Sequence, residues 1–515
     1  MENPKKKLSS NAILILLSVI MIIGGTLRFY DLSKIPLGFF CDEASIGYNA
    51  YSVLTTGKDE YDKDHPLFFE AFGEYKSPIQ IYSAIPFIAM LGLTETATRM
   101  PSALYGSIAI IGIFLLTRQI NTKNKYINYI SLFSAFLLAI SPWHIHMSRI
   151  SLEAISAFIT FTIFGLYFFL KSIKNPPLML ISSIFFTFAI YSYFPARIFI
   201  PLVGIFLIIF YIKFFLSHLK ITVLCVYIVG ILLTPMIIHL LNEGGARWEQ
   251  VSIFAQDDSL QYQLSHVVNN YISHFSPNFL FITGDSGMNG QFITRHSVRG
   301  MGELYYFQSI LLIIGAFILY KKSRKSFWLI IFLLIVYPVG SMFTIDQSAQ
   351  ATRSSIGIIP LTILSAFGIY PILYMKKKSR NIILILSSLV LFISFSLYVH
   401  AYFQNYNKYS SDFWGWQYGP NKIISYFVDH ENDYDSLYME GSFNAPQIFF
   451  HFYAANDCRN CYLGVPHEVY TPSVKQLFAL TPGYLNDHPE YSFSTKRILY
   501  YPDGTIAFLI GEIVQ

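Results

Sequence analysis

Long, almost uncharged runs of apolar residues recur along the chain and restrict its fold more than any other feature. A helix needs about 20 apolar residues to cross a bilayer core, where every backbone polar group must be hydrogen-bonded within the chain. Only 13% of the 515 residues are charged, against roughly a quarter in soluble domains. We therefore expect a polytopic α-helical membrane protein, whose runs with the length or flanks of spans are Ile13–Leu27, Ile150–Leu170, Ile221–Leu241, Ser309–Tyr320, Phe327–Phe343, Ile356–Met375 and Ile382–Val399.

Clusters of Lys and Arg that lack acids mark the turns on the cytoplasmic side. They lie at residues 5–7, 118–125, 171–174, 213–220, 321–325 and 376–380. Neighbouring clusters are far enough apart for one span out and one span back, which predicts about eleven spans with a cytoplasmic N-terminus and an outer C-terminus. The first run lacks a small-residue cleavage site, so we expect an uncleaved span. The net charge of +5 reflects this topology and does not indicate nucleic-acid binding.

The apolar segment from Pro78 to Leu93 decides the side on which the later loops lie. It has only about sixteen residues and contains Pro86, so it is short for a span and suits a helix at the membrane interface. The first outer loop then covers about residues 29–101, and a second long outer loop covers about 242–303. If residues 78–93 crossed the membrane, the downstream loops would change sides.

Acidic residues are distributed very unevenly under this assignment. Of the 31 Asp and Glu residues, only Glu2 falls in a cytoplasmic segment. Large carboxylate-rich loops outside and short basic turns inside indicate that the chemistry takes place on the outer side of the cell membrane.

The last part of the chain reads as a soluble segment after the spans. We expect a transmembrane domain at residues 1–400 and a small extracytoplasmic α/β domain at 401–515. Arg497–Tyr501 and Thr505–Ile510 flank Pro502-Asp503-Gly504 and predict a β-hairpin, and residues 421–428 and 445–454 are candidate helices. Cys458 and Cys461 are compatible with a local disulfide, since a zinc site would need two more ligands.

An acidic pair, Asp42-Glu43, follows two aromatic residues beyond the first span. Carboxylates beside a bilayer are costly unless they are used or solvated, and they can serve as general bases or metal ligands. The pattern favours a functional pair and a solvated loop pair about equally.

Cations stand at the predicted outer ends of several spans. Lys76, at the start of the interfacial helix, can hold a phosphate as a point charge, with snorkelling to lipid headgroups as the alternative. Arg353 begins a span on the outer side, which favours an anionic partner. Arg295, His296 and Arg299 crowd the end of the second long outer loop, where a structural network is the alternative.

The short loop after Pro142 supplies His144, Arg149 and Glu153. On a helix, Arg149 and Glu153 would share one face because they are four residues apart; an interfacial ion pair is the alternative. Trp143 is expected in the aromatic belt at the membrane surface. The next short outer loop supplies aromatic rings that either stack on a sugar or pack at the interface, together with a cation; its candidates are Tyr193 and Arg197.

The order of these motifs resembles that of bacterial members of glycosyltransferase family 39, relatives of the protein O-mannosyltransferases and of the lipid A aminoarabinose transferase. The resemblance covers roughly residues 10–400 and rests on order and spacing, since each motif alone is weak. Relatives of the aminoarabinose enzyme have Glu-Lys-Pro-Pro, whereas Tyr75 intervenes here and Ser77 replaces the first proline. The matching motifs are Asp42-Glu43, Glu74-Tyr75-Lys76-Ser77-Pro78, Arg99-Met100-Pro101-Ser102-Ala103-Leu104, Ser141-Pro142-Trp143-His144 through Glu153, Tyr193 through Arg197, and Ala351-Thr352-Arg353.

The resemblance implies a GT-C fold, a polyprenyl-phosphate sugar as donor, and a role for each matched residue. Asp42 would be the base that activates the acceptor, with Glu43 supporting it. Glu74 and Glu153 would orient acceptor or sugar or bind a divalent cation; Glu153 stands where other members often have Asp. The donor-phosphate ligands would be Lys76, Arg353 and Arg299, and the substrate-orienting residues would be His144, Arg149, Tyr193, Arg197 and His296.

Together these features predict an inverting transferase that moves one sugar from a polyprenyl phosphate to a protein, lipid or glycan acceptor outside the cytoplasm. A polyprenyl-lipid flippase is a second hypothesis, but it would need carboxylates near the midplane of the spans. A glycan ligase or polymerase is a third, and the mass of the product separates it from a transferase that adds one sugar.

Overall fold

The computed structural model describes residues 8–121, 124–243, 246–285, 294–345, 349–455 and 457–514. The chain divides into two compact units. The transmembrane unit comprises residues 1–30, 67–80 and 101–399, and the loop–tail unit comprises residues 31–66, 81–100 and 400–515. One boundary between the units falls near residue 400, and most of the first long loop groups with the C-terminal residues. The predicted domains at 1–400 and 401–515 remain a prediction.

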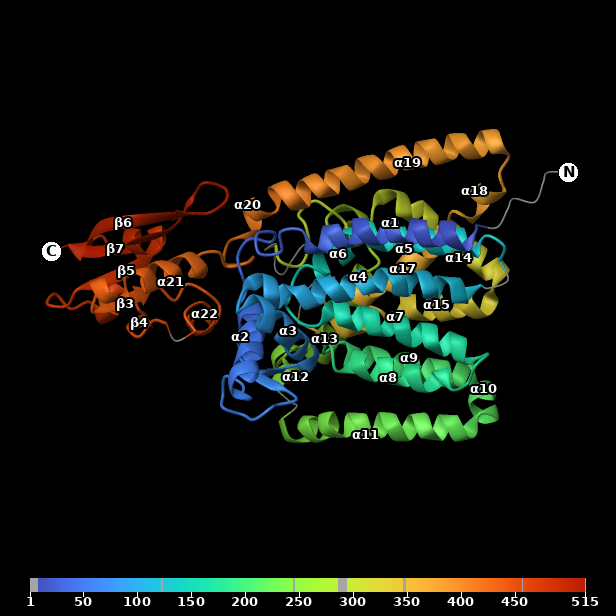
Figure 1. Ribbon diagram of the computed structural model, residues 1–515, viewed down its shortest axis with the longest axis horizontal. Coiled ribbons are helices and arrows are strands. Elements are labelled where there is room, and N and C mark those ends of the chain that lie inside the picture. Colours follow the sequence, from blue (N-terminus) through green and yellow to red (C-terminus); the bar gives the residue numbers. More distant parts are fainter. Residues whose placement is uncertain are drawn as a thin grey trace. The chain divides into compact units, whose positions relative to one another are not determined.

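A helix occupies each predicted span position, and the long helices of the transmembrane unit run roughly parallel (Figure 1). Among the described residues, seven helical stretches are long and apolar enough to cross a membrane. The helices at these positions are α1 (Ser10–Phe29), α4 (Glu95–Ile120), α5 (Ile127–Ile140), α7 (Ile155–Ser172), α8 (Leu178–Ile190), α9 (Ala196–Phe210), α11 (Leu219–Glu243), α14 (Tyr306–Lys322), α15 (Arg324–Val336), α17 (Ile358–Phe367) with α18 (Tyr370–Tyr374), and α19 (Lys377–His400).

Shorter elements connect these helices. A single turn of 3₁₀ helix, η3 (Ser355–Gly357), leads directly into α17. The others are β1 (Phe69–Ala71), β2 (Glu74–Lys76), α3 (Pro78–Leu91), α6 (Pro142–Met147), α10 (Ile212–Ser217), α12 (Ala246–Val251), η1 (Ile253–Ala255), α13 (Leu260–Ser273), the π-helix η2 (Asn278–Ile282) and α16 (Val339–Met342).

The segment that decides the topology is helical. At about 1.5 Å per residue, the 14 residues of α3 reach about 21 Å, which is less than the roughly 30 Å of a bilayer core. This length is compatible with the predicted interfacial position, which remains a prediction.

Helix packing in the transmembrane unit uses close backbone approaches. A Cβ on Gly315 of α14 would lie 1.8 Å from the Leu364 carbonyl oxygen of α17, and one on Gly368 would lie 2.4 Å from that of Leu311. Only glycine permits this distance, and small residues at such crossings are typical of membrane helices.

The loop–tail unit is built around a mixed five-stranded sheet with the order β4-β3-β5-β7-β6. The predicted hairpin is confirmed as the β6–β7 pair, as are the two predicted helices, α21 and α22, and the disulfide between Cys458 and Cys461. The elements of this unit are α2 (Cys41–Thr56), η4 (Ala401–Asn405), α20 (Asn407–Ser410), α21 (Pro420–Asp429), η5 (Glu431–Asp433), β3 (Ser436–Met439), α22 (Gln447–Tyr453), β4 (Cys461–Leu463), α23 (Pro466–Val469), β5 (Gln476–Leu480), α24 (Pro482–Asp487), β6 (Ser492–Tyr500) and β7 (Ile506–Val514).

Within this unit, the helix that carries the acidic pair packs on the C-terminal residues. A Cβ on Gly47 of α2 would lie 2.5 Å from the Phe452 ring of α22. The Phe39 ring, just before α2, lies 4.8 Å from the same ring, centroid to centroid. Burial of these aromatic rings fixes the start of α2.

Candidate functional site

The acidic pair lies in the first turn of α2, and its two members have different surroundings. Glu43 is completely buried, whereas Asp42 is partly exposed. Neighbouring side chains on an α-helix point about 100° apart, so one faces the interior while the other reaches the surface. Asp42 is therefore accessible from the surface, and Glu43 is not.

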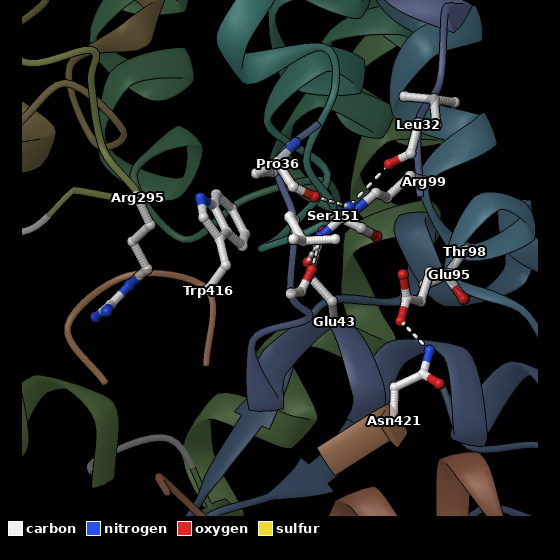
Figure 2. Close-up of polar contacts among 12 residues, drawn as sticks. Leu32, Pro36, Glu43, Glu95, Thr98, Arg99, Ser151, Arg295, Trp416 and Asn421 are labelled. Atoms are coloured by element: carbon white, nitrogen blue, oxygen red, sulfur yellow. Dashed lines mark hydrogen bonds and ion pairs between the residues drawn. The ribbon is translucent and has the colours of Figure 1, made fainter. Parts of the chain in front are cut away.

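Arg99, in the first turns of α4, binds Glu43 and organises the loop before α2 (Figure 2). Its Nε and Nη2 donate to the two Glu43 carboxylate oxygens at 2.9 and 2.6 Å. Its Nη groups also donate to the backbone carbonyls of Leu32, Pro36 and Gly38, each at 2.8 Å. Both charged side chains are fully buried. Glu43 thus anchors the loop through Arg99, and its role in supporting Asp42 stays a prediction. Arg99 is a positioning residue that the site prediction lacked.

Lys76 ends a small hairpin in the transmembrane unit. Phe72 and Gly73 have φ angles of 55° and 76°, as the two-residue turn between β1 and β2 requires. The Lys76 side chain is 1% exposed, and its Nζ lies 3.8 Å from Glu74 Oε1 and 5.4 Å from the Phe72 ring centroid. Lys76 is therefore a buried cation paired with the partly exposed Glu74.

Three predicted residues from separate segments come together beside this hairpin. Arg197, in the first turn of α9, donates from Nη2 to Ser77 Oγ at 3.3 Å. Its charge also interacts with that of Glu153. Lys76, Arg197 and Glu153 therefore form one charged cluster in the transmembrane unit.

Arg149 and His144 are buried and bind other parts of the protein. Arg149 is fully buried and donates to the carbonyls of residues 27, 28 and 30. His144 is fully buried, with Nδ1 2.6 Å from Arg28 Nη2. Burial first, and the Arg28 charge second, hold the pKa of His144 well below its usual range. Residues 149–153 lie between α6 and α7, so the expected shared helical face of Arg149 and Glu153 is wrong.

Arg353 is placed by contacts to the segment just before it. The backbone carbonyl of Ala351 accepts from Trp143 Nε1 at 2.9 Å. The backbone N–H of Ala351 donates to Asp285 Oδ2 at 2.9 Å. Trp143 is 1% exposed inside the unit, so its expected place in the aromatic belt is wrong. Arg353 and Tyr193 line the same small cavity, of about 30 Å³.

Asp285 is a functional candidate that the sequence reading missed. Its Oδ2 also lies 3.2 Å from His296 Nδ1. It therefore links His296 and the second long loop to the segment of Arg353. Arg299 is exposed in a turn three residues further on. The only local signal for Asp285 was an acid after a glycine, Gly284.

Glu303 is buried next to Asp285, and its Oε1 accepts no hydrogen bond from the described part of the chain. Burial, and then the Asp285 charge, raise the pKa of Glu303 well above its usual range. Between the unfolded-state Glu pKa of about 4.3 and the raised folded-state pKa, the folded state binds more protons than the unfolded state. The free energy of unfolding therefore falls as pH rises across this interval. A Glu303→Gln variant should therefore unfold at a higher temperature than the natural chain at pH 8, with the difference shrinking toward pH 5. A difference that does not change with pH would contradict this assignment.

The metal-ligand roles suggested for Glu74 and Glu153 find no donor set. No group of three His, Cys, Asp or Glu side chains that could hold a metal ion occurs among the described residues. Glu74 pairs with Lys76, and Glu153 interacts with Arg197.

Comparison with known proteins gives a family match over part of the chain. Residues 76–239 match the family model described as dolichyl-phosphate-mannose-protein mannosyltransferase. No curated protein matches the chain significantly.

Solved structures show the same fold at low identity. ArnT from Cupriavidus metallidurans, bound to undecaprenyl phosphate, is 12% identical with a TM-score of 0.54, and the match covers 98% of each chain. The oligosaccharyltransferase AglB from Archaeoglobus fulgidus, in complex with an inhibitory peptide and a dolichol-phosphate, is 12% identical with a TM-score of 0.54. That match covers 87% of this chain but only 64% of AglB. The family match and the shared architecture identify the chain as a multi-pass membrane protein of GT-C fold, similar to glycosyltransferase family 39.

Proposed function

We propose that this chain is a membrane glycosyltransferase that moves a single sugar from a polyprenyl-phosphate donor to a hydroxyl or amine of its acceptor. The observation that carries the proposal is Lys76, a buried cation beside a partly exposed carboxylate, at the start of the region that matches the family model. Keeping a lysine charge out of water is costly, and binding a phosphate gives that charge a function. The relatives solved with undecaprenyl phosphate or dolichol-phosphate support a donor of this chemistry.

The chemistry is a displacement at the anomeric carbon. Asp42 removes the proton of the acceptor nucleophile, which forms a bond to that carbon while the bond to the phosphate oxygen breaks, with inversion. Lys76 and Arg353 stabilise the charge on the departing polyprenyl phosphate. Glu153 and Arg197, beside Ser77, orient the sugar.

The proposal places this reaction on the extracytoplasmic side of the cell membrane. The positive-inside rule assigns the basic clusters to the cytoplasm, and the acids that would act, led by Asp42 and Glu153, lie on the opposite side. A cysteine-labelling map of the loops with an impermeant reagent tests this sidedness. Labelling of residues 31–66 from the cytoplasmic face only would contradict it.

Replacing Lys76 with glutamine should weaken donor binding more than it slows the bound donor's reaction. Hydrogen bonds to charged groups contribute about 1.5–3 kcal/mol, so the Kd for a labelled polyprenyl phosphate should rise about tenfold to a hundredfold. The matched control is Lys220→Gln, because Lys220 is an exposed lysine of the same unit. Equal binding of the lipid by Lys76→Gln and the control would remove Lys76 from the donor site.

A further inference from the structure

The loop–tail unit contains a polar cavity. None of the residues assigned to the donor phosphate lines it. Its volume is about 190 Å³. Its walls come from the loop before α2, the start of α4, the segment that leads into α21 and the end of α22, all of which belong to this one unit. We call it the Glu95 cavity, after the only acid in its lining.

Glu95 is held in place on one side and open on the other. Its Oε1 accepts from Asn421 Nδ2 at 2.9 Å and from Tyr453 Oη at 2.7 Å (Figure 2 shows the first contact). Its Oε2 accepts no hydrogen bond from any residue that the structure describes, and the side chain is partly exposed. The two donors to Oε1 fix the orientation of the carboxylate. Oε2 can therefore accept a hydrogen bond from a ligand.

Gln417 supplies a second polar group that lacks a full set of partners. The residue is 1% exposed and lines the cavity. Its Nε2 donates to the Phe413 carbonyl at 3.4 Å, while Oε1 has no donor in the described part of the chain. Leaving a buried amide oxygen without a hydrogen-bond donor costs free energy. After a small rotation of the amide, a ligand hydroxyl would supply that donor and remove the cost.

The lining also includes aromatic and cationic residues. Phe39, Tyr418 and Tyr453 contribute ring surface, and the exposed Lys34 and Lys422 stand at the edge. Aromatic surface beside a few fixed acceptors suits a ligand that has apolar C–H faces and a hydroxyl edge. Whole small-molecule sites usually occupy about 300–1,000 Å³, so a cavity of this size accommodates only part of a larger ligand.

We propose that the Glu95 cavity binds one sugar ring of the acceptor, and therefore that the acceptor is a glycan or glycolipid. This inference rests on the proposed transferase function. Phe39 is three residues before Asp42, which limits the distance between their Cα atoms to about 11 Å. A ring in the cavity thus lies close to the proposed base.

A polypeptide acceptor fits these walls less well. Extended peptides are commonly bound by adding a strand to an open sheet edge. The edge strands of the sheet, β4 and β6, contribute no residue to the lining. The cavity instead presents separate polar groups around a compact volume.

The test measures binding of sugars to the full-length protein in detergent. Saturation-transfer NMR with a panel of methyl glycosides, and with a Ser/Thr-rich peptide, would be recorded for the natural chain, Glu95→Gln and Asn421→Ala. The control is Glu490→Gln, an exposed acid of the same unit outside the cavity. Thermal unfolding of each variant would establish that it is folded.

We expect at least one glycoside to bind saturably to the natural chain and to the control, and about tenfold or more weakly to Glu95→Gln. Asn421→Ala should weaken binding in the same direction, because Glu95 loses a donor that orients it. The inference is overturned if Glu95→Gln binds like the natural chain, if no glycoside saturates up to its solubility limit, or if only the peptide binds. Absence of sugar transfer from any polyprenyl-phosphate donor by the natural chain, with glycoside binding still dependent on Glu95, would reject the proposed function and leave the sugar site intact.

Discussion

An Asp42→Asn variant is expected to lose transfer activity by about 10²–10⁴-fold, the usual contribution of a positioned general base. The amide has nearly the same shape, but it cannot take the proton of the acceptor. Asp42 is partly exposed and does not share the buried contacts of Glu43, so folding and membrane insertion should be unchanged. The measurement is the rate of sugar transfer from a purified polyprenyl-phosphate donor, with expression and thermal unfolding recorded in parallel.

The matched control is Asp62→Asn. Asp62 lies in the same loop–tail unit, and its side chain is 92% exposed. Asparagine tolerates its φ of 61°, so transfer should continue at the natural rate. Substantial transfer by the Asp42 variant would remove Asp42 as the base, whatever the control shows.

Loss of the buried Arg99–Glu43 pair should destabilise the chain strongly. Removing one partner of a buried ion pair typically costs about 3–5 kcal/mol, because the other charge remains buried without compensation. Arg99→Met also leaves three loop carbonyls without their donor. We therefore expect a clear fall in the unfolding temperature of the purified protein for Arg99→Met and for Glu43→Gln.

Arg497→Met provides the comparison for this effect. Arg497 is an exposed arginine of the same unit that stacks over the Tyr426 ring at 5.2 Å, and its loss should change stability little. If Arg99→Met unfolded at the natural temperature, the pair would not hold the loop before α2. The comparison also distinguishes the neighbours Asp42 and Glu43. Asp42→Asn should lose transfer activity, whereas Glu43→Gln should lose stability.

The positions of the membrane helices followed from the sequence because their causes are local. Each run from Ile13–Leu27 to Ile382–Val399 carries its own length, apolarity and flanking charge, and a helix satisfies its backbone within the segment. The C-terminal hairpin was predictable for the same reason: Asp503 accepts from Thr505 two residues away, so the turn is contained in its own residues.

The candidate site was predictable only as a set of residue types at the expected outer ends of the spans. The residue pattern alone did not separate Asp42 from Glu43, yet the rotation of the helix and a partner 56 residues away place one at the surface and one in the interior. Arg149 and His144 looked available for a substrate, but backbone carbonyls and Arg28 bind them. Asp285 gave almost no local signal.

The sequence by itself therefore determined that the chain crosses a membrane many times, where its helices lie, and which charged residues could act. The tertiary structure decided which of them are available. Trp143 and Ala351 are 208 residues apart and meet in one hydrogen bond, and Ala351 is held again by Asp285, 66 residues away. Burial and charge pairing depend on such distant contacts, and a linear pattern does not encode them position by position.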